Sequence, residues 1–411
     1  MKILYSLIII LYAGLARIAS LFNNKASLWV KGRSGWEKAV SDAVDTGSPK
    51  VWVHCASLGE FEQGRPVIEK IRETMPDHKI LVTFFSPSGY EIRKDWPGAD
   101  WVFYLPTDTR RNARRFIELV NPSAVIFVKY EFWNNIISEL SARKIPLLLI
   151  SAIFRRDQHF FKWYGSFFRK MLSKFTHIFV QDQLSLDLLK SIGIDQASIS
   201  GDTRFDRVKK LAGSAKVIEK IDRFRGGDRV IVAGSSWQPD EEIICRYINT
   251  NGNDLKWIIA PHEIDRQNLE RIARLLTART VFYSGNDADL QEARVMIIDN
   301  IGMLSSVYSY AFSAIVGGGF GKGIHNILEP ACWGIPVMFG PNHTRFREAV
   351  ELIEKGGAYC YRNYKEFEKI LGSLLNDSVL YEKSSAASRE YVESGTGATE
   401  KIVALLLEKR Y

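Results

Sequence analysis

Cysteine is scarce in this chain of 411 residues, which carries four: Cys55, Cys245, Cys332 and Cys360. They are widely separated, and no two of them form a Cys-x-x-Cys pair. A zinc site or a disulfide framework needs closely spaced or paired cysteines, so this pattern favours neither. We expect buried thiols in a reducing compartment.

Other signatures are missing as well. The chain has no Gly-x-Ser-x-Gly elbow, and no Ser–His–Asp arrangement can be inferred from the spacing. No internal repeat or low-complexity segment stands out. What remains is a globular composition, 46% hydrophobic and 25% charged, on a chain long enough for two domains of roughly 200 residues or fewer each. The net charge of +8 favours anionic partners: a membrane surface, phosphorylated substrates or nucleic acid.

The N-terminus departs from a soluble pattern. An uncharged run extends from Ile3 to Ala16, and apolar residues continue past Arg17 to Phe22. The run is short for a membrane span of about 20 residues, unless Arg17 reaches the interface. A signal peptide competes, but no small-x-small cleavage site leads into a cysteine-paired domain. We expect an anchor or interfacial helix, and the basic residues that follow it predict that the rest of the chain is cytoplasmic.

Apolar runs alternate with amphipathic segments along most of the chain. The predicted strands are 51–56, 79–85, 101–105, 124–130, 145–151 and 177–181, then 229–236, 255–262, 294–299, 313–319 and 335–340. This alternation predicts an α/β protein with parallel sheets covered on both faces. The predicted order is an anchor or interfacial helix (1–24), a first domain (25–205), a linker (206–228), a second domain (229–378) and a C-terminal helix that packs back on the first domain (379–411). Ligands are expected at the carboxyl ends of the strands, in a cleft between the two domains.

The stretch VWVHCASLGEFEQGRP (51–66) places two acids at the start of a predicted helix. Glu60 and Glu62 follow a buried strand and a break at Gly59. Acids are favourable in a first helical turn because they meet the positive end of the helix dipole. From the residues alone, Glu60 is therefore either a helix-start acid or a catalyst.

A glycine-rich loop, VGGGFGKGIHNILEP (316–330), is the strongest single signal. A predicted strand runs into it and a helix follows near Asn326. Glycines let backbone amides approach an anion closely, and a helix start adds its dipole. The loop matches neither Gly-x-Gly-x-x-Gly with its usual placement nor the P-loop. Glu329 could accept hydrogen bonds from ribose hydroxyls, or the loop could be an ordinary turn with a helix-start acid.

Three other groups of polar or charged residues fit either a functional role or an ordinary structural one. Arg204 is either a cation that faces the cleft or a solvated arginine of the linker. His262 and His325 follow predicted strands and are better hydrogen-bond donors than metal ligands, because no zinc spacing is present. Asp287 and Asp289 lie in a polar loop and are expected to be solvated.

The segment 154–175 interleaves lysine and arginine with phenylalanine, tryptophan and tyrosine around a single acid, Asp157. Such a helix suits an anionic lipid interface, but an ordinary amphipathic helix with its aromatics in the core fits equally. RNA binding has no accompanying signature.

Taken together and in order, the motifs resemble the bacterial Kdo transferases of lipopolysaccharide synthesis. The matching runs are WVHCASLGE, FSPSGYE, YLPTD, EFWNN, GDTRFD, AGSSWQPDEE, APHEIDR, IDNIGML, VGGGFGKGIHNILEPA and FGPNHTRF, besides the N-terminal apolar segment. The resemblance implies a membrane-associated GT-B glycosyltransferase with two Rossmann-like domains. It further implies inverting transfer of Kdo, an acidic sugar, from CMP-Kdo to the glucosamine disaccharide of a lipid A precursor at an anionic inner-leaflet surface, with no nucleic acid as partner.

The resemblance also implies roles for individual residues. Glu60 matches the general base, and Glu131 matches a glutamate that stabilises the transition state. Arg204 stands where the family has a lysine, so charge is kept while a planar fork replaces a point charge. The residues that match the CMP-binding segments are Pro261, His262, Ile301, Gly302, Met303, Asn326, Ile327, Leu328 and Glu329, with possible phosphate or sugar contacts at Ser235, Gly318 and Gly319. No metal and no cofactor is implied. The open alternatives are a GT-B enzyme that uses a UDP-sugar and a non-catalytic membrane-bound nucleotide-sugar binding protein.

Overall fold

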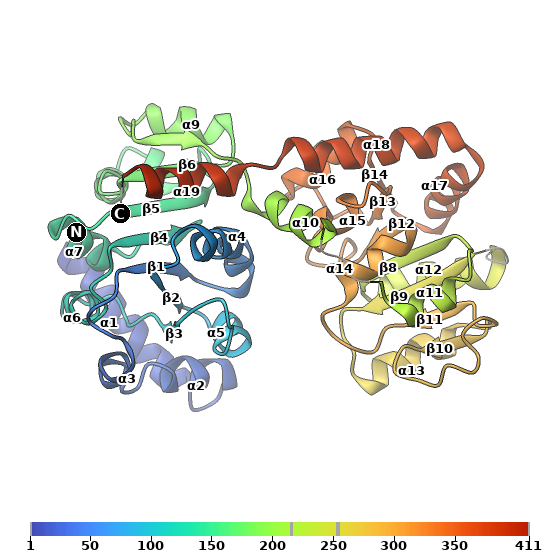
Figure 1. Cartoon of the computed structure of the whole chain (residues 1–411), viewed down its shortest axis with the longest axis horizontal. Helices are drawn as coiled ribbons and strands as arrows, with labels where there is room; N and C mark the ends of the chain where they lie inside the picture. Colours follow the sequence, from blue (N-terminus) through green and yellow to red (C-terminus); the bar gives the residue numbers. More distant parts are fainter. Residues whose placement is uncertain (1, 214–216, 252–254, 410–411) are drawn as a thin grey trace. The chain divides into compact units, whose positions relative to one another are not determined.

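The computed structural model describes residues 2–213, 217–251 and 255–409. The chain divides into two compact units (Figure 1). Unit 1 contains Met1–Asp206 together with Thr396–Tyr411, and unit 2 contains Arg207–Gly395. The chain therefore leaves unit 1 once and returns to it with its last residues.

Unit 1 is built on a parallel sheet of seven strands in the order β3-β2-β1-β4-β5-β6-β7. The strands are β1 (Lys50–Cys55), β2 (Lys79–Phe84), β3 (Trp101–Tyr104), β4 (Ala124–Val128), β5 (Leu147–Ala152), β6 (His177–Val180) and β7 (Ala197–Ile199). Its helices are α1 (Lys2–Ala19), α2 (Asn24–Lys31), α3 (Trp36–Ala43), α4 (Leu58–Thr74), α5 (Pro87–Arg93), α6 (Arg110–Val120), α7 (Asn134–Ala142), α8 (Ser166–Leu172), α9 (Gln183–Lys190) and α19 (Ala398–Glu408), with a 3-10 turn η1 (His159–Phe161).

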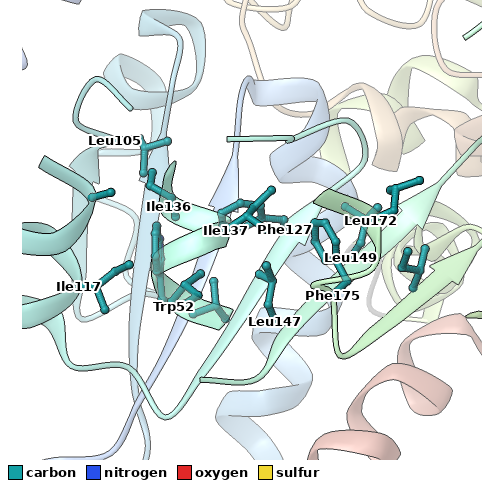
Figure 2. Close-up of a cluster of buried hydrophobic side chains, with 14 of the residues drawn as sticks. Trp52, Leu105, Ile117, Phe127, Ile136, Ile137, Leu147, Leu149, Leu172 and Phe175 are labelled. Atoms are coloured by element: carbon teal, nitrogen blue, oxygen red, sulfur yellow. The ribbon is translucent and has the colours of Figure 1, made fainter. Parts of the chain in front are cut away.

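The central strands of unit 1 are buried on both faces, and their residues alternate between two apolar clusters. Trp52, Phe127 and Leu149 belong to one cluster, which α6 and α7 cover (Figure 2). The neighbouring residues Val53 and Ile126 belong to the other, which α4 and α19 cover. Alternate strand residues point to opposite faces, so a sheet covered on both sides needs the nearly continuous apolar runs seen in the sequence.

Unit 2 repeats this plan with a parallel sheet in the order β10-β11-β9-β8-β12-β13-β14. The strands are β8 (Val230–Ser236), β9 (Lys256–Pro261), β10 (Thr280–Phe282), β11 (Val295–Ile297), β12 (Ala311–Val316), β13 (Val337–Phe339) and β14 (Ala358–Cys360). The remaining helices are α10 (Thr203–Gly213), α11 (Glu219–Arg225), α12 (Gln238–Asn251), α13 (Arg266–Leu275), α14 (Leu304–Val307), α15 (Leu328–Ala331), α16 (Arg347–Glu354), α17 (Tyr364–Asn376) and α18 (Ser378–Ser394), with η2 (Tyr308–Tyr310). The predicted α/β class with two Rossmann-like, GT-B-type units is confirmed.

The predicted linker contains helices, and the single helix predicted at the C-terminus is two helices. Most of α10 and all of α11 fall within the predicted linker, 206–228. Within 379–411, the chain forms α18 in unit 2 and, after a turn at Gly397 with φ of +103°, α19 in unit 1. Helix α19 packs against α4 (Figure 1).

The N-terminal apolar run forms α1, whose large apolar side chains remain mostly exposed. None of the helices in the described part of the chain is long and apolar enough to cross a membrane, so the expectation of a spanning anchor is not supported. The basic residues that follow are not all surface charges. Arg33 is buried, and its guanidinium donates to the carbonyl oxygens of Leu105 (2.8 Å), Phe85 (2.8 Å) and Trp29 (3.1 Å).

The aromatic and basic segment 154–175 is not one continuous helix. It contains η1 and α8, separated by a turn at Gly165, where a Cβ atom would lie 2.3 Å from the carbonyl oxygen of His159. Phe154, Phe160 and Phe175 are buried in the core, whereas Trp163 is 92% exposed. The segment therefore supplies core aromatics and an exposed tryptophan together.

Candidate active site

Glu60 lies in the first turn of α4, directly after the carboxyl end of β1. Its side chain turns back, and Oε2 accepts a hydrogen bond from the Ala56 amide. Burial, followed by the negative charge of Glu131, raises the pKa of Glu60 to about 7, while the amides of Ala56 and Ser57 and the charge of Lys129 offset part of that rise. A helix-start acid is normally stabilised as its anion, so here burial and a second carboxylate outweigh the helix.

Glu131 follows β4 and is only 7% exposed. Its Oε2 atom accepts from Trp133 Nε1 (2.6 Å) and lies 2.8 Å from His54 Nε2. His54 Nδ1 in turn lies 2.8 Å from Thr83 Oγ1 on β2. Side chains from the ends of β1 and β2, together with Trp133, thus hold the buried carboxylate that follows β4 in place.

The backbone at these strand ends adopts an unusual conformation. Lys129 has φ of +66° after β4, and Ser151 has φ of +53° within β5. Side-chain-bearing residues rarely adopt positive φ, and such positions cluster at functional sites. The Ser151 hydroxyl lies 3.1 Å from that of Thr203, at the first residue of α10.

Arg204 is neither a solvated arginine nor an isolated cation. Its Nε (2.9 Å) and Nη2 (2.7 Å) both donate to Oδ2 of the buried Asp202, and its own amide donates to Oδ1 (3.0 Å). The Arg204 side chain is 26% exposed, and this charge-assisted contact fixes its direction where α10 begins.

In unit 2, the glycine-rich loop follows β12 and packs against two neighbouring strand ends. A Cβ atom on Gly317 would lie 2.2 Å from the Ser235 carbonyl oxygen, and one on Gly319 would lie 2.5 Å from the Gly340 nitrogen. The Gly318 amide donates to Asp240 Oδ2 (3.0 Å). Glycine is thus required for close packing of backbones, in addition to any role in approaching an anion.

Glu329 lies in the single turn of α15 and is held by two donors. Ser305 Oγ donates to Oε2 (2.5 Å), and Asn326 Nδ2 donates to Oε1 (3.0 Å). Partial burial lowers the pKa of the half-buried Arg207, and the negative charge of Glu329 offsets part of that change, so the two charges interact. Ile327 and Leu328 are fully buried, so their side chains belong to the core.

Two histidines and a tryptophan gather at the ends of β8 and β9. His262 directly follows Pro261, the last residue of β9; its ring stacks on Trp237 at 4.5 Å and lies 4.6 Å from His325, centroid to centroid. Trp237 Nε1 donates to His325 Nε2 (3.0 Å). Burial and then His262 lower the pKa of His325 to about 4, so His325 is neutral near pH 7 and its Nε2 is an acceptor.

The remaining predicted residues of unit 2 lie on loops at the same edge of the sheet. Ile301 is 87% exposed, Gly302 has φ of +100°, and Met303 precedes α14, which carries Ser305. Ser235, near the end of β8, has φ of +50°. Asp287 and Asp289, expected from the sequence to be solvated, form ion pairs with Lys220, Arg223 and Arg279 at the surface. Within residues 2–213, 217–251 and 255–409, no three His, Cys, Asp or Glu side chains gather as a metal-binding cluster.

Several site residues escaped prediction from the sequence. In the sequence, His54 is identified only as part of a predicted apolar strand and Trp237 only as part of a longer motif, while Ser305 follows directly after one. A histidine within a fully buried strand was the available signal for His54, because a buried imidazole needs hydrogen-bond partners. Each unit gathers its residues at the carboxyl ends of its own strands, as the fold predicts.

Comparison with known proteins agrees with this arrangement. Residues 30–207 match the family described as 3-deoxy-D-manno-octulosonic-acid transferase (kdotransferase). A solved structure, UDP-GlcNAc 2-epimerase from Neisseria meningitidis bound to UDP-GlcNAc, has a TM-score of 0.63 and 18% identity over 87% of this chain and 100% of its own, which shows a shared fold alone.

Two relatives carry the name 3-deoxy-D-manno-octulosonic acid transferase. The protein of Haemophilus influenzae is 27% identical, over 87% of this chain and 86% of its own length. That of Aquifex aeolicus is 33% identical, over 79% of this chain and 86% of its own length. The chain therefore belongs to the 3-deoxy-D-manno-octulosonic acid (Kdo) transferase family.

Proposed function

We propose that this Kdo transferase takes the sugar from CMP-Kdo and places it on the glucosamine disaccharide of a lipid A precursor, in lipopolysaccharide synthesis. The observation that carries the proposal is the half-buried Glu60, at the start of α4 after β1, whose pKa is raised to about 7 by desolvation and by Glu131. A general base works best when its pKa lies near the working pH. Glu60 meets that requirement because burial and Glu131 act together.

In the proposed reaction, Glu60 accepts the proton of an acceptor hydroxyl as its oxygen attacks the anomeric carbon of Kdo. The new bond joins the acceptor oxygen to that carbon, and the bond from the carbon to the phosphate oxygen breaks. CMP leaves as a phosphate monoester anion, and the configuration at the anomeric carbon inverts. Glu131 serves this step by raising the proton affinity of Glu60, and it is the candidate for stabilising the developing positive charge on the sugar.

The donor is assigned to unit 2. Glu329, held by Ser305 and Asn326, presents a carboxylate suited to accepting hydrogen bonds from ribose hydroxyls. The amides of the glycine-rich loop and of the first turn of α15 are candidates for neutralising the phosphate without a metal ion. Pro261, His262 and the 301–303 segment lie on the same strand-end edge and are the candidates for contact with the base.

We further propose that α1 lies on the cytoplasmic face of the inner membrane as an interfacial helix. Its exposed face carries Leu4, Leu7, Ile8, Leu11, Leu15 and Ile18, each more than half exposed. A helix that lies on the protein surface and presents an exposed apolar face suits interfacial attachment, because that face can be buried at the boundary of the lipid headgroups. The exposed cations Arg155, Arg156 and Lys170, in the same segment as the exposed Trp163, add attraction to anionic lipid.

A transfer assay tests the proposal. The purified chain is given radiolabelled CMP-Kdo and lipid IVA, and we expect a labelled lipid product whose formation excess CMP inhibits and excess UDP does not. Inhibition by UDP instead would point to a UDP-sugar enzyme of the same fold. Binding of CMP-Kdo without any labelled lipid would point to a non-catalytic nucleotide-sugar binding protein, and either result contradicts the proposal.

A further inference from the structure

Helix α1 has a second face, which the protein partly buries. The half-buried residues on this face, Tyr5, Ser6, Ile9, Ala13 and Ala16, recur with the spacing of a helix. Tyr5 and Ser6 both carry hydroxyls, but Ser6 Oγ is buried without a hydrogen-bond partner among the described residues, whereas the Tyr5 hydroxyl has two. Its contacts therefore do more than ordinary helix packing requires.

The Tyr5 hydroxyl joins α1 to the start of α7. It donates to Asp108 Oδ2 (2.6 Å) and accepts from the Asn134 amide (3.2 Å). Asp108 also accepts from the amides of Asn135 and Ile136, each at 2.9 Å. The N-cap residue of α7, Trp133, makes no side-chain cap of its own, so Tyr5 and Asp108 supply from elsewhere in the fold the acceptors that a helix start requires.

The start of α7 is one of two supports for Glu131. The loop that carries Glu131 ends at Trp133 and passes directly into α7. Both supports contact the same oxygen of Glu131, Oε2: one is His54 Nε2 and the other is Trp133 Nε1. The backbone position of Trp133 depends on where α7 begins. Trp133 also packs against Phe85, with ring centroids 4.7 Å apart.

The protonation states of Asp108 and Tyr5 are consistent with their support of α7. Burial raises the pKa of Asp108 to about 6, and the Tyr5 hydroxyl and the two α7 amides offset part of that rise. Burial and the charge of Asp108 raise the pKa of Tyr5 well above its ordinary value, so Tyr5 remains a phenol that can donate across the working pH range.

We propose that Tyr5 is a positioning residue of the transferase site, which holds the start of α7 and thereby the carboxylate of Glu131. This inference rests on the proposed function, because it takes Glu131 as part of the reaction. Helix α1 is then a component of the site in unit 1 as well as a surface for lipid. The hydroxyl of Tyr5 acts through Asp108 and Trp133 and does not itself touch the reacting atoms.

The test compares Tyr5→Phe with Tyr12→Phe. Tyr12 lies on the same helix, and its hydroxyl makes no hydrogen bond within the part of the chain that the structure describes, so its loss is a matched control. For Tyr5→Phe we expect kcat to fall about tenfold, the loss of roughly one buried hydrogen bond, while the KM for CMP-Kdo stays unchanged. For Tyr12→Phe we expect neither value to change.

A double-mutant cycle separates positioning from general loss of stability. Added to Glu131→Gln, Tyr5→Phe should cost little further activity, because the two substitutions act on one support. A full tenfold loss in that background, or an equal loss in Tyr12→Phe, would overturn the proposal. Asp108→Asn is the second variant, and it should reproduce the kcat defect of Tyr5→Phe.

Hydrogen exchange gives a readout that does not need activity. Tyr5→Phe should speed amide exchange in the peptide that contains Asn134, Asn135 and Ile136, and Tyr12→Phe should not. Unchanged exchange in Tyr5→Phe would overturn the positioning role even if the wild-type chain transferred no Kdo. Absent transfer by the wild type, with exchange changed as expected, would count against the proposed function alone.

Discussion

The two units have the same architecture, but the candidate site of unit 1 is made mainly of side chains and that of unit 2 largely of backbone groups. In unit 1, side chains form the candidate site: burial and Glu131 raise the pKa of Glu60, and His54 and Trp133 hold the Glu131 carboxylate. In unit 2, much of the site is backbone, since the glycine-rich loop packs where no Cβ atom fits. A parallel sheet gathers residues at its strand ends in either case, and the chemistry decides whether side chains or amides are needed there.

This difference predicts different failures. Changing a side chain in unit 1 should remove chemistry and leave the fold intact. Changing a glycine in unit 2 should disturb the fold and nucleotide binding together, because the obstacle is another backbone.

The largest expected effect is that of Glu60→Gln. Gln is close in shape and can still accept from the Ala56 amide, but it cannot take the proton of an acceptor hydroxyl. We expect kcat to fall by about 10²–10⁴-fold, while CMP affinity, measured by calorimetry, stays unchanged. Turnover close to that of the wild type would contradict the assignment of Glu60 as the base.

Thermal unfolding of the same variant provides its control. Because the folded pKa of Glu60 is raised from 4.5 to about 7, its ionisation opposes folding, and stability is lost as pH rises through that window. Glu60→Gln should therefore unfold at a higher temperature than the wild type at pH 8, and the difference should shrink toward pH 4.5. A lower unfolding temperature at pH 8 would mean that lost activity reflects a damaged fold.

Gly317→Ala should give the next largest effect. The new Cβ atom would meet the Ser235 carbonyl oxygen at 2.2 Å, and overpacking of this kind costs about 1–3 kcal/mol or more. We expect a lower unfolding temperature and weaker CMP binding. Gly321→Ala is the matched comparison, since its Cβ atom would meet only the Gly318 carbonyl oxygen at 3.7 Å; equal losses in both variants would show that crowding is not the cause.

A smaller effect concerns pH. The rate constant kcat/KM of the wild type should rise with pH through about 7, as Glu60 loses its proton. Glu131→Gln removes a negative charge that raises the pKa of Glu60, so the rise should move to lower pH in that variant. The pH profile of transfer measures this directly. An unchanged profile in Glu131→Gln would show that the charge of Glu131 does not affect the pKa of Glu60.

The smallest expected effect is on membrane attachment. Replacing Arg155 by Gln should weaken binding to anionic vesicles by roughly fivefold at low salt, since one cation near such a surface contributes about 1 kcal/mol, and by less at high salt. Arg266→Gln, on an exposed helix of unit 2, is the control. Arg169 is unsuited to this test because its guanidinium donates to the carbonyl oxygens of Phe160 and Lys162 (both 3.0 Å).

Much of the fold could be predicted from the sequence because long buried strands leave a clear pattern. Each predicted run overlaps a strand, from β1 to β6 and in β8, β9, β11, β12 and β13. The three strands that were not predicted, β7, β10 and β14, have three residues each and are mostly half-buried. They lie at the edges of their sheets, where only one neighbouring strand constrains the side chains.

The candidate site was less predictable, because its contacts join residues far apart in the chain. The placement of Glu60 after a buried strand followed from a local pattern, whereas its raised pKa depends on Glu131 and on burial. The support of Glu131 by His54 spans 77 positions, and that of α7 by Tyr5 spans more than 100. Arg33 is a further example of a contact between distant residues. It is one of the basic residues after the N-terminal run that indicated a cytoplasmic location, but its side chain is buried and donates to three carbonyl oxygens.

The return of α19 to unit 1 has a consequence for how the protein is made. Ile402, Val403 and Leu406 complete the apolar cluster under α4, and Asp206 accepts from the amides of Gly397 and Thr399 where the chain re-enters. A ribosome adding about 5–20 residues per second needs roughly 10–40 s to make the roughly 190 residues between the two parts of unit 1. Throughout that interval the nascent unit 1 lacks α19, so its apolar surface beside α4 is open to chaperones until that helix has been made.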